Sequence, residues 1–423
     1  METITKNNIK KYSTYKNSGV EWLGEIPEHW EVKKVKHYGR IKSGESVVNS
    51  LLTEEGLYEV YGGNGKMGFY NKFNVESLHI IIGRVGAYCG NVRLINEKKW
   101  ISDNALILTL TDNNNCNYLS ILLKAGNLNN LNTSSAQPLI TGSKVLNFYI
   151  PIPPLSEQTK IAKFLDDKTK KIDEAIAIKT QQINLLKERK QILIHKAVTR
   201  GLDTNVKLKN SGVEWIGEIP VHWDFTFLKR YCLKVTDGSH HSPQTQFEGK
   251  NYISVKDVDE FGNIDSINCK KIDEKDFDDL ARNGCRPKKH DILLTKDGTI
   301  GRAAIVGNNN DFVALSSLGI ITPNLKYFNP KYLRYFLISP LCVNQMYSLI
   351  AGSALTRLTI EKINQLYVII PPLSEQKEIS SYIEKSSEKI TTAIGLKSEE
   401  IEKLKEYKSS LINSVVTGKV RVC

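Results

Sequence analysis

The chain has 423 residues, more than one hydrophobic core usually organises, so two or more folded units are expected. Its composition, with 40% hydrophobic and 25% charged residues, is typical of globular proteins and excludes wholesale disorder. A net charge of +12 favours a polyanionic partner but does not identify one.

Neither a membrane segment nor a cysteine-based site is indicated. The longest apolar runs, such as LYVIIPPL, are far too short to span a bilayer, and the first residues lack the apolar segment of a signal peptide. We therefore expect a cytoplasmic protein with no membrane partner. The seven cysteines are odd in number and widely scattered, which argues against a disulfide framework and a zinc site, so no metal is predicted.

Two repeated motifs divide the sequence into four segments. NSGVEWLGEIPEHW at residues 17–30 returns with two substitutions at residues 210–223, and PPLSEQ begins at Pro153 and again at Pro371. The second pair of motifs encloses 25 more residues than the first pair. The chain is therefore a tandem repeat in which the region between the motifs varies.

The two regions between the motifs are predicted to be mixed α/β domains, at residues 1–155 and 205–373. Short β-rich runs such as LHIIIG, NALILTL, DILLTKDG and VALSSLGIIT alternate with Gly, Asn and Asp turns. Brief helices are expected at CNYLSILLKAG in the first domain and PKYLRYFLISP in the second. These patterns predict an α+β fold class.

The remaining segments, residues 156–204 and 374–423, are predicted to be single long helices. Each follows a Pro-Pro pair and contains no further proline. The serine of each PPLSEQ block is placed to cap its helix, and the glutamate favours the positive end of the helix dipole.

Apolar residues recur in both long helices at spacings of four and three, as in a coiled-coil seam. We expect the two helices to bury these seams against each other, although each could instead lie along its own domain. The predicted seam residues are Ile172, Ile176, Ile183, Leu186, Leu193, Ile390, Ile394, Ile401, Leu404 and Leu411.

No catalytic constellation is evident. FNPKYL at residues 328–333 superficially resembles the N-P-P-[YF] loop of adenine methyltransferases, but Lys331 replaces the second proline and no glycine-rich turn for S-adenosylmethionine is present. Helix capping by Asn329, with Pro330 at the first helical position, explains the sequence better. There is also no phosphate-binding loop for ATP, so no enzyme activity is predicted.

Polar loops rich in glycine occur at corresponding places in the two domains. They are YGGNGKMGFYN and GRVGAYCGN in the first domain, and DGSHHSPQT and KDGTIGRA in the second. Each domain also has a polar segment before its Pro-Pro pair, SSAQPLITGSKV or GSALTRLTIEKI. The glycines of any one loop could simply form hairpin turns. Because the loops occur twice in parallel, we favour contacts to base edges and phosphates.

Together these features resemble the specificity subunit of type I restriction-modification systems. The resemblance covers essentially the whole chain and rests on the two EW-x-GEIP-x-HW blocks, the two PPLSEQ blocks, and the endings LIHKAVTRGLD and LINSVVTGKVRV. It implies two target recognition domains, each reading one half of a split, asymmetric DNA sequence. It also implies that the two helices pair as an antiparallel coiled coil that spaces the half-sites, with an internal pseudo-twofold repeat.

The resemblance assigns catalysis to partners. Two modification subunits would transfer methyl groups from S-adenosylmethionine to adenine, and restriction subunits would translocate and cut DNA with ATP and Mg²⁺. The expected partners of this chain are therefore double-stranded DNA and those subunits, with no cofactor of its own, in a system of phage defence.

By analogy and loop chemistry, ten residues are candidates for DNA binding. They are Lys66, Arg84, Tyr88, Asn91 and Gln137 in the first domain, and Ser239, His240, Lys296, Arg302 and Arg357 in the second. The tryptophans of the repeated EW-x-GEIP-x-HW block are instead expected to pack each domain against its helix. A coiled-coil scaffold without sequence-specific DNA binding remains the alternative function.

Overall fold

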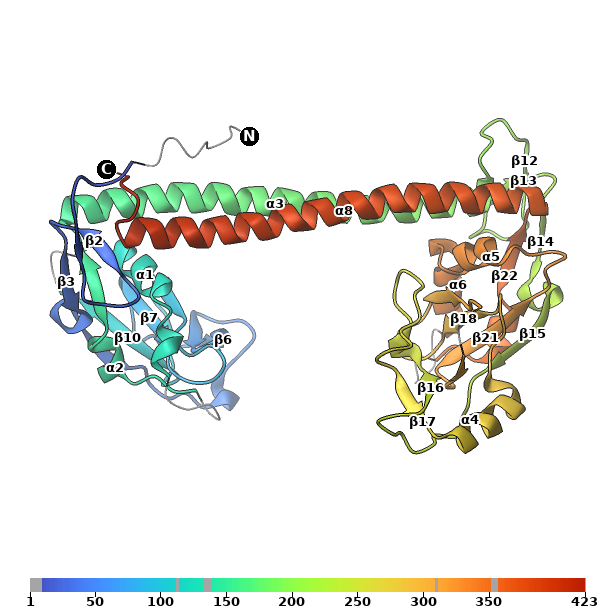
Figure 1. Ribbon diagram of the computed structural model, residues 1–423, viewed down its shortest axis with the longest axis horizontal. Coiled ribbons are helices and arrows are strands. Elements are labelled where there is room, and N and C mark those ends of the chain that lie inside the picture. Colours follow the sequence, from blue (N-terminus) through green and yellow to red (C-terminus); the bar gives the residue numbers. More distant parts are fainter. Residues whose placement is uncertain (1–9, 112–113, 133–137, 309–310, 351–356, 423) are drawn as a thin grey trace. The chain divides into compact units, whose positions relative to one another are not determined.

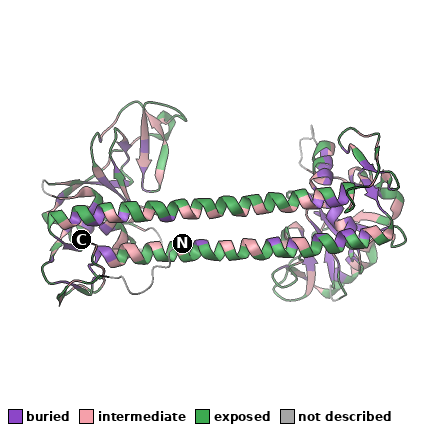
Figure 2. Ribbon diagram, turned by 90° about the horizontal axis from the view of Figure 1, so that it is seen from above, coloured by how far each residue is buried: buried purple, intermediate pink, exposed green. Residues whose placement is uncertain are grey.

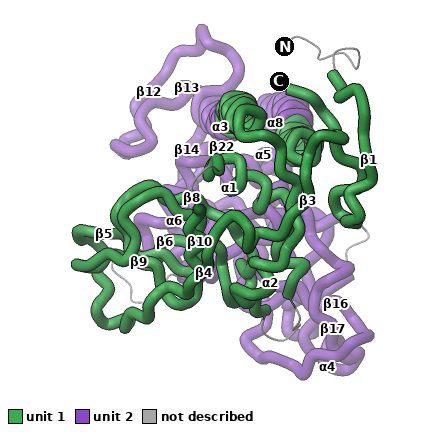
Figure 3. The backbone as a smooth tube through the Cα atoms, turned by 90° about the vertical axis from the view of Figure 1, so that its left-hand side faces the viewer, with its two compact units in different colours: residues 1–180, 398–423 green, residues 181–397 purple. Residues whose placement is uncertain are grey.

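The computed structural model describes the chain at residues 10–111, 114–132, 138–308, 311–350 and 357–422. It contains two compact units, coloured separately in Figure 3: residues 1–180 with 398–423, and residues 181–397. Both units combine small sheets and short helices with parts of two long helices, which agrees with the predicted α+β class (Figure 1). Among the described residues, no helix has the length and apolar character needed to cross a membrane.

The first unit is built on an antiparallel four-stranded sheet in the order β4-β10-β7-β8. A second sheet has the order β6-β5-β9, in which β5 pairs antiparallel with β6 and parallel with β9. The strands of these two sheets are β4 (Gly39–Ser43), β5 (Tyr58–Gly62), β6 (Gly65–Tyr70), β7 (His79–Gly83), β8 (Val92–Ile95), β9 (Trp100–Ile101) and β10 (Ala105–Leu110).

Both faces of the four-stranded sheet are buried, which explains the continuous apolar run LHIIIG. Successive side chains of a strand point to opposite faces. Ile80 and Ile82 join the core formed with helix α1 (Cys116–Ala125), whereas Ile81 packs in a separate cluster with Ile101 of the second sheet.

The second unit repeats this arrangement strand for strand. Its four-stranded sheet has the order β15-β21-β18-β19, and its three-stranded sheet has the order β17-β16-β20 with the same parallel and antiparallel pairings. The strands are β15 (Cys232–Asp237), β16 (Lys250–Ile253), β17 (Lys270–Ile272), β18 (Ile292–Thr295), β19 (Ala303–Ile305), β20 (Phe312–Ala314) and β21 (Leu318–Pro323).

Each unit also has two small antiparallel sheets within and directly beside the repeated motifs. In the first unit, β1 (Tyr15–Asn17) pairs with β2 (Glu25–Pro27), and β3 (Glu31–Lys34) pairs with β11 (Tyr149–Ile152). The second unit has the corresponding pairs β12 (Leu208–Asn210) with β13 (Glu218–Pro220), and β14 (Asp224–Phe227) with β22 (Tyr367–Ile370).

The predicted short helices are present as α1 and α5 (Pro330–Leu337). Asn329 caps α5 as expected, because its side chain accepts hydrogen bonds from the amides of Lys331 and Tyr332. The sequence patterns did not predict three further short helices, α2 (Gly142–Leu146), α6 (Pro340–Ile350) and α7 (Ile360–Asn364). The acidic run DEKDFDD at residues 273–279, whose even spread suits a solvated helix face, lies in α4 (Glu274–Leu280) and its cap. The run VALSSLGIIT forms parts of two strands in different sheets, β20 and β21.

The long helices are α3 (Leu155–Arg200) and α8 (Leu373–Val416). Capping by Ser156 was wrong: α3 already begins at Leu155, because the Pro154 carbonyl accepts the first helical hydrogen bond from the Gln158 amide. The corresponding Ser374 likewise lies inside the first turn of α8. Glu157 lies in the first turn, as predicted from the helix dipole.

The ten predicted seam residues are all buried or half-buried, whereas Ile178, Leu185 and Leu396 beside the seam are exposed. Figure 2 shows the same recurrence of buried and intermediate positions along otherwise exposed helices. In the first unit, Asp173 pairs with Lys408 at 2.6 Å, and Lys179 pairs with Glu400. The two segments therefore run in opposite directions past each other.

The repeated motifs bind each other in both units. The indole Nε1 of Trp30, which is fully buried, donates to Glu157 at 3.0 Å, and the ring of His29 contacts the same carboxylate at 2.7 Å. In the second unit, Trp223 and His222 make the matching contacts to Glu375 at 2.9 and 2.7 Å. We call this contact the carboxylate clamp. It confirms, for these two tryptophans, that the EW-x-GEIP-x-HW block packs against the neighbouring helix.

The glutamine of each PPLSEQ block makes a second link. Gln158 accepts a hydrogen bond from the amide of Asn115, the residue that caps α1, and Gln376 does the same for Asn329, which caps α5. Both glutamine side chains are buried, so each bond satisfies a polar group that water cannot reach. The start of a long helix is thus tied both to the strands and to a short helix of its unit.

We predict that Glu157→Ala destabilises the first unit selectively. Removing the carboxylate leaves the buried Trp30 indole without an acceptor, which costs on the order of 1–3 kcal/mol. Calorimetric unfolding of the full chain should show a lower transition temperature for the first unit and an unchanged one for the second. Glu174→Ala, an exposed change on the same helix, is the control. Equal effects of the two substitutions would contradict the clamp.

Candidate nucleic-acid interface

The loop after β7 in the first unit corresponds to the loop after β18 in the second. Arg84 follows β7, donates its amide to the Asn104 carbonyl and accepts from the Ile140 amide. Lys296 follows β18 and makes the same two bonds, to Ser317 and from Leu358. Arg84 and Lys296 therefore occupy equivalent backbone positions.

The segments before the Pro-Pro pairs join these loops through isolated strand bridges. Val85 bridges to Leu139 in the first unit, and Asp297 bridges to Arg357 in the second. The ends of β4 and β15 lie beside the same loops, since Arg84 Nη1 donates to Ser43 Oγ at 2.9 Å and Lys296 Nζ lies 3.8 Å from Asp237. Three stretches that are distant in sequence therefore meet at one end of each four-stranded sheet.

A glycine follows each of these strand ends for a steric reason. A Cβ atom on Gly44 would lie 2.2 Å from the Ser102 carbonyl oxygen, and one on Gly238 would lie 2.1 Å from the Ala314 carbonyl oxygen. No side chain fits at such distances, so the loop backbone can pass close to the neighbouring strand only at glycine.

In the second unit, five side chains form a continuous series of ion pairs and one hydrogen bond, which we call the charge chain. His240 contacts Asp237 at 2.7 Å, Asp237 lies 3.8 Å from Lys296, Lys296 lies 3.6 Å from Asp297, and Asp297 contacts Arg357 at 3.0 Å. Burial lowers the pKa of Lys296, and the two neighbouring carboxylates partly offset that effect. Three predicted candidates, His240, Lys296 and Arg357, therefore lie in one cluster.

The equivalent positions in the first unit carry mainly uncharged side chains. Ser43, Val85 and Leu139 stand where the second unit has Asp237, Asp297 and Arg357. Arg84 is half-buried, and its Nε has no hydrogen-bond acceptor among the described residues. This guanidinium nitrogen is a buried donor without an acceptor among those residues.

The other first-unit candidates are spread over two loops. Tyr88 and Asn91 are exposed and follow Arg84 in the β7–β8 connection. Lys66 lies on β6 and pairs with Glu59 at 2.9 Å. Hydrogen bonds from Lys99 and Lys66 lower the pKa of Glu59 to about 2, so Lys66 already has an anionic partner. Gln137 lies outside the described residues.

The remaining second-unit candidates have structural partners. Ser239 is buried, and its hydroxyl donates to the His241 carbonyl. Arg302 is half-buried and donates Nη1 to the Val258 carbonyl at 3.1 Å. Both lie near charge-chain residues in sequence, but the Ser239 hydroxyl and one guanidinium nitrogen of Arg302 are already bonded within the protein.

Nothing in the described part of the chain groups three or more His, Cys, Asp or Glu side chains as a metal site would. Burial raises the pKa of Cys116 to about 11 and that of Cys232 to about 12, so these thiols stay protonated at neutral pH. The side chains of these loops supply hydrogen-bonding and charged groups, which can recognise a ligand.

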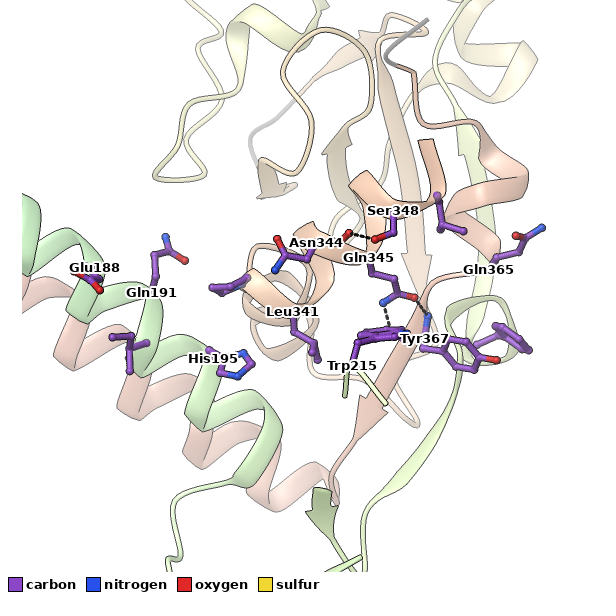
Figure 4. A pocket seen from close by; sticks show the side chains of 14 residues that line it. Glu188, Gln191, His195, Trp215, Leu341, Asn344, Gln345, Ser348, Gln365 and Tyr367 are labelled. Atoms are coloured by element: carbon purple, nitrogen blue, oxygen red, sulfur yellow. Dashed lines mark hydrogen bonds between the residues drawn. The ribbon is translucent and has the colours of Figure 1, made fainter. Parts of the chain in front are cut away.

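A large cavity lies elsewhere in the second unit. It encloses about 910 Å³ between α3, α6 and β22, and its lining includes Trp215, Leu341 and Tyr367 (Figure 4). At its floor the side chain of Gln345 bonds to both backbone groups of Tyr367. The lining includes none of the nine candidate residues that the structure describes.

Comparison with known proteins identifies the family. The chain matches the type I restriction modification DNA specificity domain over residues 27–188 and 245–403, which together exceed half of its length. The chain belongs to this family.

Relatives and solved structures of specificity subunits extend over almost the whole chain. The putative type I restriction enzyme MjaX specificity subunit of Methanocaldococcus jannaschii is 26% identical over 438 aligned residues, covering 95% of this chain and 96% of that protein. A chain from a type I R-M system, solved in a study of complex assembly and conformational transition, covers 92% of this chain and 98% of its own length, with 14% identity and a TM-score of 0.68. The HsdS subunit from Thermoanaerobacter tengcongensis, also 14% identical, has a TM-score of 0.50 and covers 93% and 98%. At these identities the two structures support the fold.

Several residues that hold the loops of the specificity domains in place were not predicted from the sequence. Arg93 on β8 donates to the carbonyls of Gly63 and Asn64 at 3.1 and 2.7 Å and so holds the YGGNG turn. Asp237 and Asp297 were present in the quoted loops but were not selected. What distinguishes these two carboxylates is that the equivalent first-unit positions, Ser43 and Val85, are uncharged. This difference can be recognised only when the two domains are aligned by strand order.

We predict that Arg84→Ala weakens DNA binding by the specificity subunit. Loss of a good base contact costs about 1–3 kcal/mol of binding free energy and relaxes the base preference at one position of the DNA site. Loss of a phosphate contact instead weakens binding to all sequences and reduces the slope of log affinity against log salt concentration by about one. Titration of labelled duplexes at several salt concentrations separates these cases. Arg40→Ala, an exposed change at the far end of β4, is the control. Unchanged affinity and unchanged site choice would remove Arg84 from the interface.

Proposed function

We propose that this chain selects the DNA sequence on which a type I restriction-modification complex acts. Family membership supports this role, and the observation that carries it is the pair of units with one backbone plan and unlike loop chemistry. A duplicated fold with identical loops would read two identical sequences. Here the equivalent positions carry Ser43 and Val85 in one unit and Asp237 and Asp297 in the other.

The proposed target is a split, asymmetric DNA site with one half-site for each unit. Side chains specify sequence through base edges, and contacts to phosphates fix orientation without specifying sequence. The proposed base-reading residues are Tyr88, Asn91 and His240, which are exposed, and Arg84 and Arg357, which are half-buried. Lys66 and Arg302 are proposed to contribute mainly through phosphate contacts or loop structure.

The long helices are proposed to pair as an antiparallel coiled coil that sets the distance between the half-sites. The buried seam and the opposed order of the ion pairs in the first unit support this arrangement. In the proposed division, residues 1–155 and 205–373 are target recognition domains, and residues 156–204 and 374–423 are spacer helices. A pseudo-twofold relation between the halves follows from the tandem repeat.

The chain is proposed to work without catalysis of its own, as members of its family leave catalysis to other subunits. Two methyltransferase subunits and the restriction subunits are the proposed protein partners, and they would bring S-adenosylmethionine, ATP and Mg²⁺. The proposed location is the cytoplasm, where these partners meet chromosomal and invading DNA.

Selection from randomised duplexes tests this function directly. The full chain is combined with its methyltransferase subunits, bound DNA is recovered, and methylated adenines are mapped. We expect enrichment of two defined segments separated by a gap of fixed length, with a methylated adenine in each. The methyltransferase subunits alone are the control and should enrich no sequence. Failure of the complete complex to enrich a split motif would instead support a scaffold without sequence-specific binding.

A further inference from the structure

The charge chain has a buried centre and exposed ends. The side chain of Lys296 is 1% exposed, whereas that of Arg357 is 41% exposed and that of His240 is 64% exposed. A duplex can therefore reach the guanidinium and the imidazole without any rearrangement of the protein. It cannot reach the ammonium group of Lys296 in the same way, so direct DNA contact does not account for this residue.

Within the described residues, the ion pair of Arg357 leaves two guanidinium nitrogens for a base. Its Nε pairs with Asp297, which leaves the two terminal nitrogens of the guanidinium unassigned to that carboxylate. Two such donors match the O6 and N7 acceptors of guanine in the major groove. At the other end of the chain, His240 directs Nε2 to Asp237, which leaves Nδ1 as its second polar atom.

We propose that Lys296 is a positioning residue that holds Asp237 and Asp297, and through them His240 and Arg357, as a preformed reader of a guanine-containing half-site. The inference rests on the proposed DNA-reading function and goes beyond it by naming the residues and the base. Because both ends are held before DNA arrives, binding loses less side-chain entropy than it would with two free side chains.

The location of Lys296 makes a purely stabilising role an inadequate explanation. A buried ammonium loses its hydration, and an apolar side chain of similar volume is often neutral or stabilising in such a place. The groups facing Lys296 are the two carboxylates, which favour its charge, and Arg357, which opposes it. A costly charge of this kind is better explained by the geometry that it imposes on its partners.

The first unit provides a natural comparison, because its equivalent positions contain no charge chain. Arg84 occupies the place of Lys296, while the partner positions carry Ser43, Val85 and Leu139. An arginine is therefore compatible with this backbone position. The absence of carboxylates at these first-unit positions also means that the two units would read their half-sites by different chemistry.

The test is a double-mutant cycle in the full chain bound to its methyltransferase subunits. Lys296→Met, Arg357→Ala and the double variant are compared by fluorescence anisotropy on the selected duplex and on duplexes altered at each base of both half-sites. We expect each single variant to weaken binding about tenfold, the effect of losing one good base contact. Both should lose preference at the same guanine, with the double variant no weaker than either single one.

Two further variants complete the cycle. Lys296→Arg should restore base preference, as Arg84 suggests, and Lys275→Met, an exposed change on α4, should leave binding within about twofold of the wild type. The inference would be overturned if the double variant lost DNA affinity by the product of the losses in Lys296→Met and Arg357→Ala. It would also be overturned if Lys296→Met kept the wild-type base preference.

If Lys296→Met does not assemble, Asp297→Asn makes the same test, because this side chain is 26% exposed. Retained preference for the guanine in that variant would overturn the inference. A wild-type complex with no sequence preference at all would refute the proposed function itself. A wild-type complex whose base preference does not change when Lys296 is substituted would refute only the role of Lys296.

Discussion

One half-buried carboxylate at the start of each long helix joins the parts of its unit. Glu157 and Glu375 each receive a buried indole and a histidine ring from the EW-x-GEIP-x-HW block. Burial alone would raise the pKa of Glu157, but the hydrogen bonds from His29, Trp30 and the Tyr12 hydroxyl outweigh that effect and lower it, so the group stays ionised. The adjacent glutamines bind the caps of α1 and α5. Strands, short helices and the long helix of a unit therefore depend on two consecutive side chains.

This arrangement separates the part of the sequence that must stay constant from the part that can vary. The clamp and the buried apolar strands define the same backbone in both units, and the loops at the end of the four-stranded sheet vary in chemistry. Arg84 and Lys296 keep equivalent backbone bonds, although one lies beside a serine and the other between two carboxylates. A stable fold can therefore carry different recognition surfaces without a change in its core.

The sequence was sufficient to predict the features that repeat or have a clear period. These are the tandem organisation, the two long helices with their seams, the apolar strands, and the capping of α5 by Asn329. The strand order could not be predicted, because pairing between distant strands leaves no local pattern. The burial of Lys296 was also inaccessible, since it depends on β15, β18 and the segment before α7 meeting in space. The partner of Lys66 was also missed, because Glu59 lies diagonally across the β5–β6 pair from it, in a register that the sequence alone does not reveal.

Replacing one domain by the other within one chain tests most directly whether the carboxylate clamp can hold either DNA-recognition domain. Residues 31–152 would be replaced by residues 224–370, which leaves both EW-x-GEIP-x-HW blocks and both PPLSEQ blocks in place. Adenine methylation would then be mapped in DNA modified by the complex that contains this chain. We predict a palindromic motif in which the second half-site occurs on both sides of the gap. Methylation of the original asymmetric motif would contradict the account.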